Sequence, residues 1–99
     1  MNYLEGDHLL RIDKYLKLSR LIKRRTIAQE MVEIGAVRIN AKTCKSAAEV
    51  RTDDIIEIAY PGRIVKVRVL TSDESQLKKN AAAYELVEEK KANREERPW

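Results

Sequence analysis

The spacing of apolar residues changes part-way along the chain, and this change limits the possible folds more than any other feature. In the first third, residues such as Ile12, Tyr15 and Leu16 recur at the spacing of a helical face. From Val37 onward apolar residues alternate with polar ones, as in strands. A chain of 99 residues has room for one core. The sequence therefore predicts one small α+β domain, in which two helices pack on an antiparallel sheet or hairpin.

Two helices are predicted at the start of this domain. The first begins at Arg11, and Asp13 suits the positive end of its dipole. The run from Thr26 to Gln29 fits the capping box, in which Thr26 caps the second helix and Gln29 reaches back. Gly35 suits a left-handed end of this helix. The face that we expect to be buried consists of Ile27, Met31 and Ile34, with Ala28 and Val32 beside them.

Short strands follow, and then the composition changes. Ile55–Tyr60 and Ile64–Leu70 flank the turn at Pro61 and Gly62, which predicts a hairpin. Asp73–Lys91 is rich in Ala, Glu, Lys and Gln, which favour helices. We therefore expect a flexible extension over residues 1–10, a domain over 11–70 and a C-terminal helical tail over 71–99. The tail helix either packs on the domain or extends freely from it, or it binds a partner.

The excess positive charge lies in one part of the chain. The net charge is +4, but Arg11–Lys45 holds ten basic and only three acidic residues. Residues 51–99 hold ten of each. A segment that is so one-sided indicates a polyanionic partner, most simply a nucleic acid. The alternative, a basic surface that only contacts water, is disfavoured because balancing acidic residues are nearly absent.

Six basic residues are the candidates for contact with nucleic acid. If the apolar faces of both helices are buried, these residues face water, and several meet near the start of the second helix. Guanidinium groups and unpaired backbone N–H groups both suit phosphate oxygens. Two short helices and a hairpin suit the irregular shape of RNA. Stacking of single-stranded bases is not expected, because Tyr15 and Tyr60 are predicted in or beside the core and Tyr84 in the tail. The candidates are Arg11, Lys14, Arg20, Lys23, Arg24 and Arg25.

No catalytic, metal or cofactor site is predicted. Cys44 and His8 are single residues of their kind, so that neither a disulfide nor a metal site is expected. Met1–His8 lacks the basic start of a signal peptide, and apolar runs fall far short of the ~20 residues of a membrane span. We expect a cytoplasmic, monomeric, non-enzymatic protein without cofactors.

Several short motifs resemble a known family. They are Arg11-Ile-Asp-Lys-Tyr-Leu, Ser19-Arg, Lys23-Arg-Arg-Thr-Ile-Ala, Ile34-Gly-Ala-Val-Arg-Ile-Asn and Lys45-Ser. Together they resemble the S-four-type RNA-binding domain, also called the alpha-L motif, over about Arg11–Leu70. The run from Ser19 to Thr26 and the tail are similar to those of the bacterial ribosome-associated quality-control factors that stabilise P-site tRNA, relatives of the fifteen-kilodalton heat-shock protein.

This resemblance implies a function beyond the charges. Such factors bind stalled large ribosomal subunits, contact large-subunit rRNA and P-site peptidyl-tRNA, and work beside the factor responsible for alanine tailing. Arg11 and Arg25 match positions expected to touch RNA. The chain departs from the family pattern in its ten residues before Arg11, and in Asn40-Ala41, where Asn-Gly is common. The alternatives are a heat-shock-type recycling factor and an RNA-binding or protein-binding adaptor.

Overall fold

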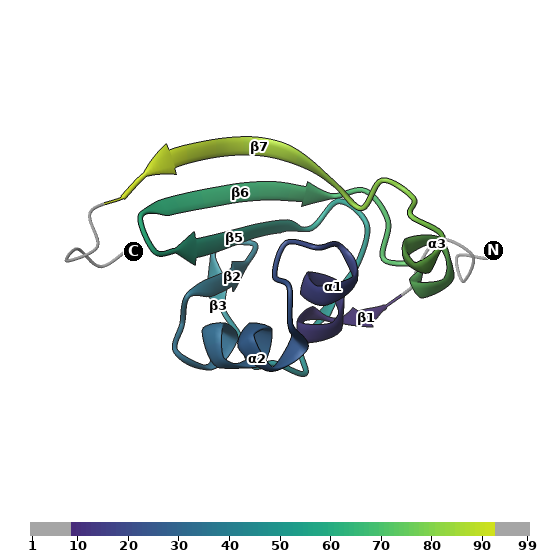
Figure 1. Cartoon of the computed structure of the whole chain (residues 1–99), viewed down its shortest axis with the longest axis horizontal. Helices are drawn as coiled ribbons and strands as arrows, with labels where there is room; N and C mark the ends of the chain where they lie inside the picture. The colour runs from purple at the N-terminus through teal and green to yellow at the C-terminus, as the bar shows by residue number, and fades with distance from the viewer. Residues whose placement is uncertain (1–8, 93–99) are drawn as a thin grey trace.

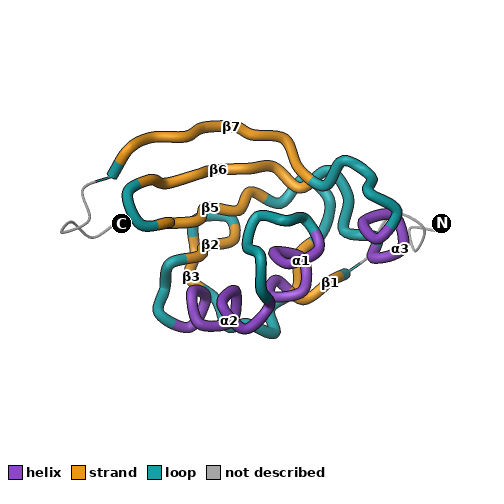
Figure 2. The backbone as a smooth tube through the Cα atoms, in the orientation of Figure 1, coloured by secondary structure: helices purple, strands orange, loops and turns teal. Residues whose placement is uncertain are grey.

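Two helices lie against one antiparallel sheet in the computed structural model, which describes residues 9–92 (Figure 1). The five-stranded sheet has the order β3-β2-β5-β6-β7 (Figure 2). A small two-stranded sheet joins β1 to β4. The predicted α+β class is confirmed. The helices are α1 (Ile12–Leu18), α2 (Arg25–Glu33) and α3 (Glu74–Lys78). The strands are β1 (Leu10–Arg11), β2 (Val37–Ile39), β3 (Lys42–Thr43), β4 (Glu49–Val50), β5 (Ile55–Tyr60), β6 (Arg63–Val69) and β7 (Tyr84–Lys91).

The core lies between α1 and the sheet. Ile12, Tyr15 and Leu16 are fully buried, as their spacing predicts, and share one cluster with Ile56 and Val67 of the central strands. The Tyr15 hydroxyl donates a hydrogen bond of 2.6 Å to the Ala83 carbonyl oxygen. A phenol that is buried needs such an acceptor, so that this bond ties α1 to the segment before β7.

The second helix differs from its prediction at both its start and its buried face. It begins at Arg25, and no side chain caps it. The predicted capping box is therefore wrong, and Gln29 donates to Asp13 instead. Ala28 and Val32 are buried, whereas Ile27 and Ile34 are 43% and 78% exposed. Two apolar faces lie side by side on α2, one with Ile27 and Ile34 and one with Ala28 and Val32. The second face is buried because the small Ala28 side chain lets α2 approach α1 more closely.

Gly35 ends α2 as predicted. Its φ is +82°, in the left-handed region that glycine enters without a steric penalty. The Gly35 N–H donates to the Val32 carbonyl and the Ala36 N–H to the Met31 carbonyl. These two bonds form a Schellman motif, which pairs carbonyl groups at the helix end and turns the chain into β2.

The C-terminal segment is mainly a strand, so the predicted helical tail is wrong. Only Glu74–Lys78 is helical, and Tyr84–Lys91 pairs along β6, from Val69↔Tyr84 to Arg63↔Lys91. The helix-forming composition of this segment is a local preference. It is outweighed because β6 offers a full row of backbone groups that would otherwise form an open edge. Residues 1–8, which were expected to be flexible, and residues 93–99 lie outside the described part.

The hairpin between β2 and β3 uses two left-handed residues. Asn40 and Ala41 have φ values of +51° and +70°, the combination found in a type I′ turn. Asn40 is stabilised there, since its side chain donates to Asp54 and accepts from the Ile55 N–H. Ala41 has no such compensation, and a Cβ atom makes this conformation unfavourable.

Replacing Ala41 by glycine is therefore expected to stabilise the protein. Relief of the left-handed strain outweighs the extra freedom of the unfolded chain, for a net gain of about 0.5–1 kcal/mol. Thermal or urea unfolding measures this gain. Ala47→Gly is the matched control, because Ala47 is also exposed but has negative φ, so the same change should destabilise. Equal effects of the two variants would contradict the explanation.

Candidate nucleic-acid interface

The loop between α1 and α2 carries three of the candidate cations and is fixed to the sheet. The Tyr60 hydroxyl donates a 2.6 Å bond to the Leu21 carbonyl, and Ile22 is buried. Arg20, with φ of +69°, donates a 2.9 Å bond to the Asn80 side-chain oxygen. The loop is therefore held from two sides, and it presents its charges in a defined position.

Arg11 and Arg25 meet at one buried carboxylate, that of Asp13. Nη2 of Arg11 lies 3.0 Å from one Asp13 oxygen, and Nη2 of Arg25 lies 3.5 Å from the other. Gln29 donates a further bond of 2.9 Å. The Asp13 side chain is fully buried, whereas those of Arg11 and Arg25 are 46% and 41% exposed. The carboxylate thus orients two arginines, one just before α1 and one at the start of α2, and both side chains are partly exposed to water.

The environment of Asp13 keeps it ionised. Burial by itself would raise the pKa of the Asp13 carboxyl. Hydrogen bonds from Gln29 and Arg11, together with the positive charge of Arg25, outweigh burial, so that the pKa lies below its usual value. The Arg25 Nε atom is buried and has no hydrogen-bond partner in residues 9–92. Asp13 is therefore a charged anchor beneath the surface rather than a contact to a ligand.

Lys14 is paired with an acidic residue of the C-terminal segment. Its Nζ atom lies 2.8 Å from Oε2 of Glu74, and the Lys78 ammonium lies 2.9 Å from the same oxygen. The hydrogen bonds from Lys14 and Lys78 lower the pKa of Glu74 to about 2. Because Glu74 already balances its charge, Lys14 is expected to attract an anionic ligand less strongly than the unpaired cations of the loop.

Replacing Glu74 by glutamine is expected to lower the melting temperature at neutral pH. The folded pKa of Glu74 is depressed, so its stabilisation is complete above the usual value of 4.5 and is lost as pH falls towards about 2. The gap between wild type and variant should close over that range. Glu88→Gln is the control, since Glu88 faces one lysine at 3.6 Å and should have a smaller effect. A gap that does not depend on pH would contradict the assignment.

Lys23 and Arg24 are exposed, and neither forms an ion pair with any other residue in the described range 9–92. Arg24 immediately precedes α2, and the backbone N–H groups of a first helical turn have no partners within the helix. We call the six candidates together the basic face: Arg11, Lys14, Arg20, Lys23, Arg24 and Arg25. The six residues extend from the end of β1 through α1 and the loop to the start of α2.

Several cations of the second half form ion pairs with acidic side chains close to them. On the β6–β7 pair, Arg63 contacts Glu89 and Lys66 contacts Glu88. Arg68 lies between Asp53 and Glu85, at 2.6 and 2.9 Å. These pairs place acidic side chains directly beside cations of the β6–β7 region. The positive surplus of the chain is thus concentrated on the basic face.

The sequence missed the residues that support the basic face. Asp13 was assigned to the helix dipole and Gln29 to a capping box, although Asp13 orients the arginines and Gln29 donates to Asp13. Asn80 and Glu74 were placed in a separate helix. The only signal for Asp13 was its position two residues after Arg11, which lets the two side chains meet.

Nothing in the described residues suggests bond-making chemistry. No group of three or more potential metal ligands occurs among residues 9–92, and no helix there is long and apolar enough to cross a membrane. Burial and the charge of Glu33 raise the pKa of the half-buried Cys44 thiol, so that the reactive thiolate is disfavoured. The basic face is therefore the candidate site, and its chemistry is that of anion binding.

These features define an S4-domain protein, and the comparisons agree. The S4 domain family matches residues 10–56. The RQC P-site tRNA stabilizing factor of Streptococcus pneumoniae is 40% identical over 81% of this chain and 92% of its own length. The Bacillus subtilis factor of that name is 36% identical over 83% and 96%. In fold, the chain resembles the trimeric structure of Vibrio cholerae heat shock protein 15, with a TM-score of 0.66, 21% identity and coverage of 81% and 83%.

The chain belongs to the family of RQC P-site tRNA stabilizing factors. This is a family of non-catalytic RNA-binding factors, which confirms the expectation that the chain is not an enzyme. The expected S-four-type domain is likewise confirmed. The individual contacts of the basic face stay predictions.

Proposed function

We propose that this protein binds stalled large ribosomal subunits and stabilises P-site peptidyl-tRNA during ribosome-associated quality control and alanine tailing. The observation that carries the proposal is the basic face, in which one buried carboxylate orients Arg11 and Arg25. The relatives are named for stabilising P-site tRNA, which supports the choice of RNA. Contacts to large-subunit rRNA and to the tRNA use Arg11 and Arg25 first, with Arg24, Lys23, Arg20 and Lys14 in support.

The physical basis is the release of counterions. Each phosphate that a lysine or arginine neutralises frees ions, so that affinity falls steeply with salt. An arginine whose guanidinium is already oriented loses less freedom on binding than a free side chain. The domain acts as a cytoplasmic monomer beside the alanine-tailing factor, and it needs no cofactor.

Affinity capture of the tagged protein from bacterial lysate tests this proposal. Sedimentation and RNA sequencing of the captured material should recover large subunits with tRNA and little small-subunit rRNA. Arg11→Gln, Arg25→Gln and Arg24→Gln should each reduce recovery, and each should reduce the slope of log affinity against log salt by about one. Lys90→Gln is the control, because it removes the same charge from exposed β7.

Recovery of intact ribosomes or small subunits would refute the assigned pathway. Large subunits without peptidyl-tRNA would favour a recycling factor, the function that the fold likeness to heat shock protein 15 makes the second candidate. Protein capture that is unaffected by salt and free of RNA would refute the whole proposal.

A further inference from the structure

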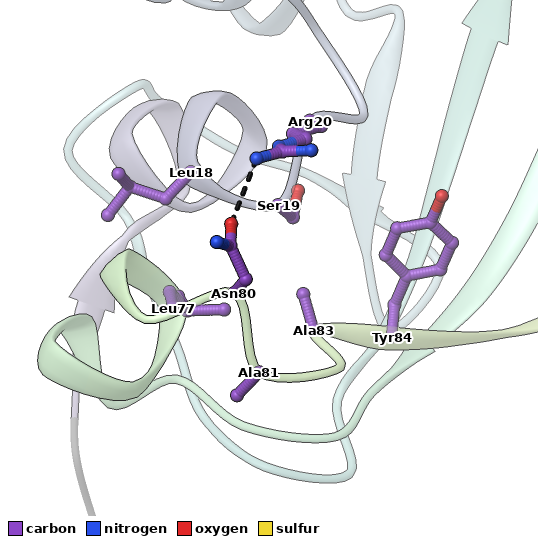
Figure 3. A pocket seen from close by; sticks show the side chains of 8 residues that line it. All are labelled: Leu18, Ser19, Arg20, Leu77, Asn80, Ala81, Ala83 and Tyr84. Carbon is purple, nitrogen blue, oxygen red and sulfur yellow. Dashed lines mark hydrogen bonds between the residues drawn. The ribbon is translucent and has the colours of Figure 1, made fainter.

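A hollow beside the basic face is built partly by the C-terminal segment (Figure 3). Its volume is about 290 Å³. One wall is the end of α1 with Leu18 and Arg20, and the other is the α3–β7 link with Leu77 and Ala81. Tyr84 lies at the start of β7 beside Ala83, and the Arg20–Asn80 hydrogen bond joins the two walls (Figure 3). Since the sequence suggested that Tyr84 was far from the basic residues, this arrangement was not foreseen.

The lining has the chemistry of a base-binding site. Leucine, alanine and tyrosine side chains line the hollow together with the polar Ser19, Arg20 and Asn80. No acidic residue lines it, and its one charge is the Arg20 guanidinium. Asn80 uses its oxygen for Arg20 and has amide N–H groups left to donate. Apolar walls with a few polar groups are typical of sites for small planar ligands. The volume is near the lower limit of such sites, so that it suits one base and excludes a duplex.

A second hollow of about 240 Å³ continues on the far side of Arg20 and Tyr84. There the Arg63 guanidinium lies over the Tyr60 ring, 4.6 Å from its centre. Glu89 also lines it and pairs with Arg63, which leaves Arg20 as the unbalanced charge. Arg20 and Tyr84 line both hollows, so the two hollows adjoin at these side chains.

We propose that the hollow between α1 and the α3–β7 link receives a single unpaired base of the RNA bound on the basic face. This inference rests on the proposed function and adds to it a preference for an extruded nucleotide. The base lies between the aliphatic wall and Tyr84, and Arg20 contacts the adjoining phosphate. Arg20 belongs to both surfaces, so phosphates held by Arg24 and Arg25 bring a neighbouring nucleotide within reach of the hollow.

The test compares two RNA hairpins of equal length, one fully paired and one with a single bulged nucleotide. Stacking of one base contributes a preference on the order of tenfold, so the full chain should bind the bulged hairpin that much more tightly. A fluorescent base analogue at the bulge should also change its emission on binding. Tyr84→Leu, which keeps apolar bulk but removes the ring, should abolish the preference, and Tyr84→Phe should keep it.

Ala81→Leu provides a second variant that fills the hollow and removes no charge. Ala82→Leu is its matched control, because Ala82 is also exposed but does not line the hollow. The preference should be lost in the first and kept in the second. Equal affinity of the wild type for both hairpins, or a preference that survives both Tyr84→Leu and Ala81→Leu, would overturn the inference while leaving the proposed function intact. If neither hairpin nor the large subunit binds in a salt-dependent way, the proposed function fails and the inference fails with it.

Discussion

Replacing Asp13 by alanine is expected to weaken RNA binding at least tenfold, although Asp13 is fully buried and contacts no ligand. Its carboxylate receives bonds from Arg11, Arg25 and Gln29. Without it the two guanidinium groups repel each other and lose their fixed orientation. Binding RNA must then order both side chains, and this costs conformational entropy that the wild type does not lose. Unfolding should also become easier by about 2–3 kcal/mol, because bonds to a charged group are lost and Gln29 keeps a half-buried donor without its acceptor. Filter binding and urea unfolding measure the two effects.

Arg24→Gln separates these two effects. It removes a charge from the basic face at an exposed residue that has no ion pair within residues 9–92, so binding should weaken and stability should stay unchanged. For Asp13→Ala, the stability gap to wild type should narrow as pH falls below 3.8. The folded pKa of Asp13 is depressed, and its stabilisation is lost on protonation. An Asp13→Ala variant that binds RNA like the wild type would refute the anchor role.

Deleting residues 71–99 is expected to prevent cooperative folding. The truncated chain leaves β6 with an open edge, removes the buried Leu77 and leaves the buried Tyr15 hydroxyl without its acceptor at Ala83. Leaving the buried Tyr15 hydroxyl without an acceptor costs about 1–3 kcal/mol by itself, which is a large part of the free energy of unfolding of a small domain. Near-ultraviolet circular dichroism and thermal melting should show no native transition, and RNA binding should be lost with the fold.

A synthetic peptide of residues 71–92 gives the control for this deletion. Added in trans, it should restore the native spectrum, because it carries β7 and Ala83. A truncated chain that melts cooperatively near the wild-type temperature would show that the domain ends at Leu70. If that chain also kept RNA binding and lost only a protein partner, the segment would be an adaptor.

Local sequence patterns predicted correctly those features of the fold that depend on a single helix or turn. The face of α1, the hairpin of β5 and β6, and the end of α2 at Gly35 follow from spacing and turn chemistry. The basic face also followed from the sequence, because the count of charges does not depend on the fold. For α2 two adjacent apolar faces were possible, and only packing against α1 chooses Ala28 over Ile27.

The rest depends on residues that are distant in sequence. The β7 strand exists because β6 has an edge to cover, which no window of 20 residues reveals. Asp13 is an anchor only because α2 places Arg25 and Gln29 beside it. In the same way, the hollow at Tyr84 requires the end of α1 and the start of β7 to meet.

The bond from Tyr15 to Ala83 joins positions 68 residues apart, and it has a consequence for the protein during its own synthesis. A chain leaves the ribosome from its N-terminus, so the basic residues of α1 emerge long before the segment that holds them in place. The pairing of β6 with β7 is likewise completed only when the last strand is free. The cationic surface is therefore fully ordered only once the chain as far as β7 has left the ribosome.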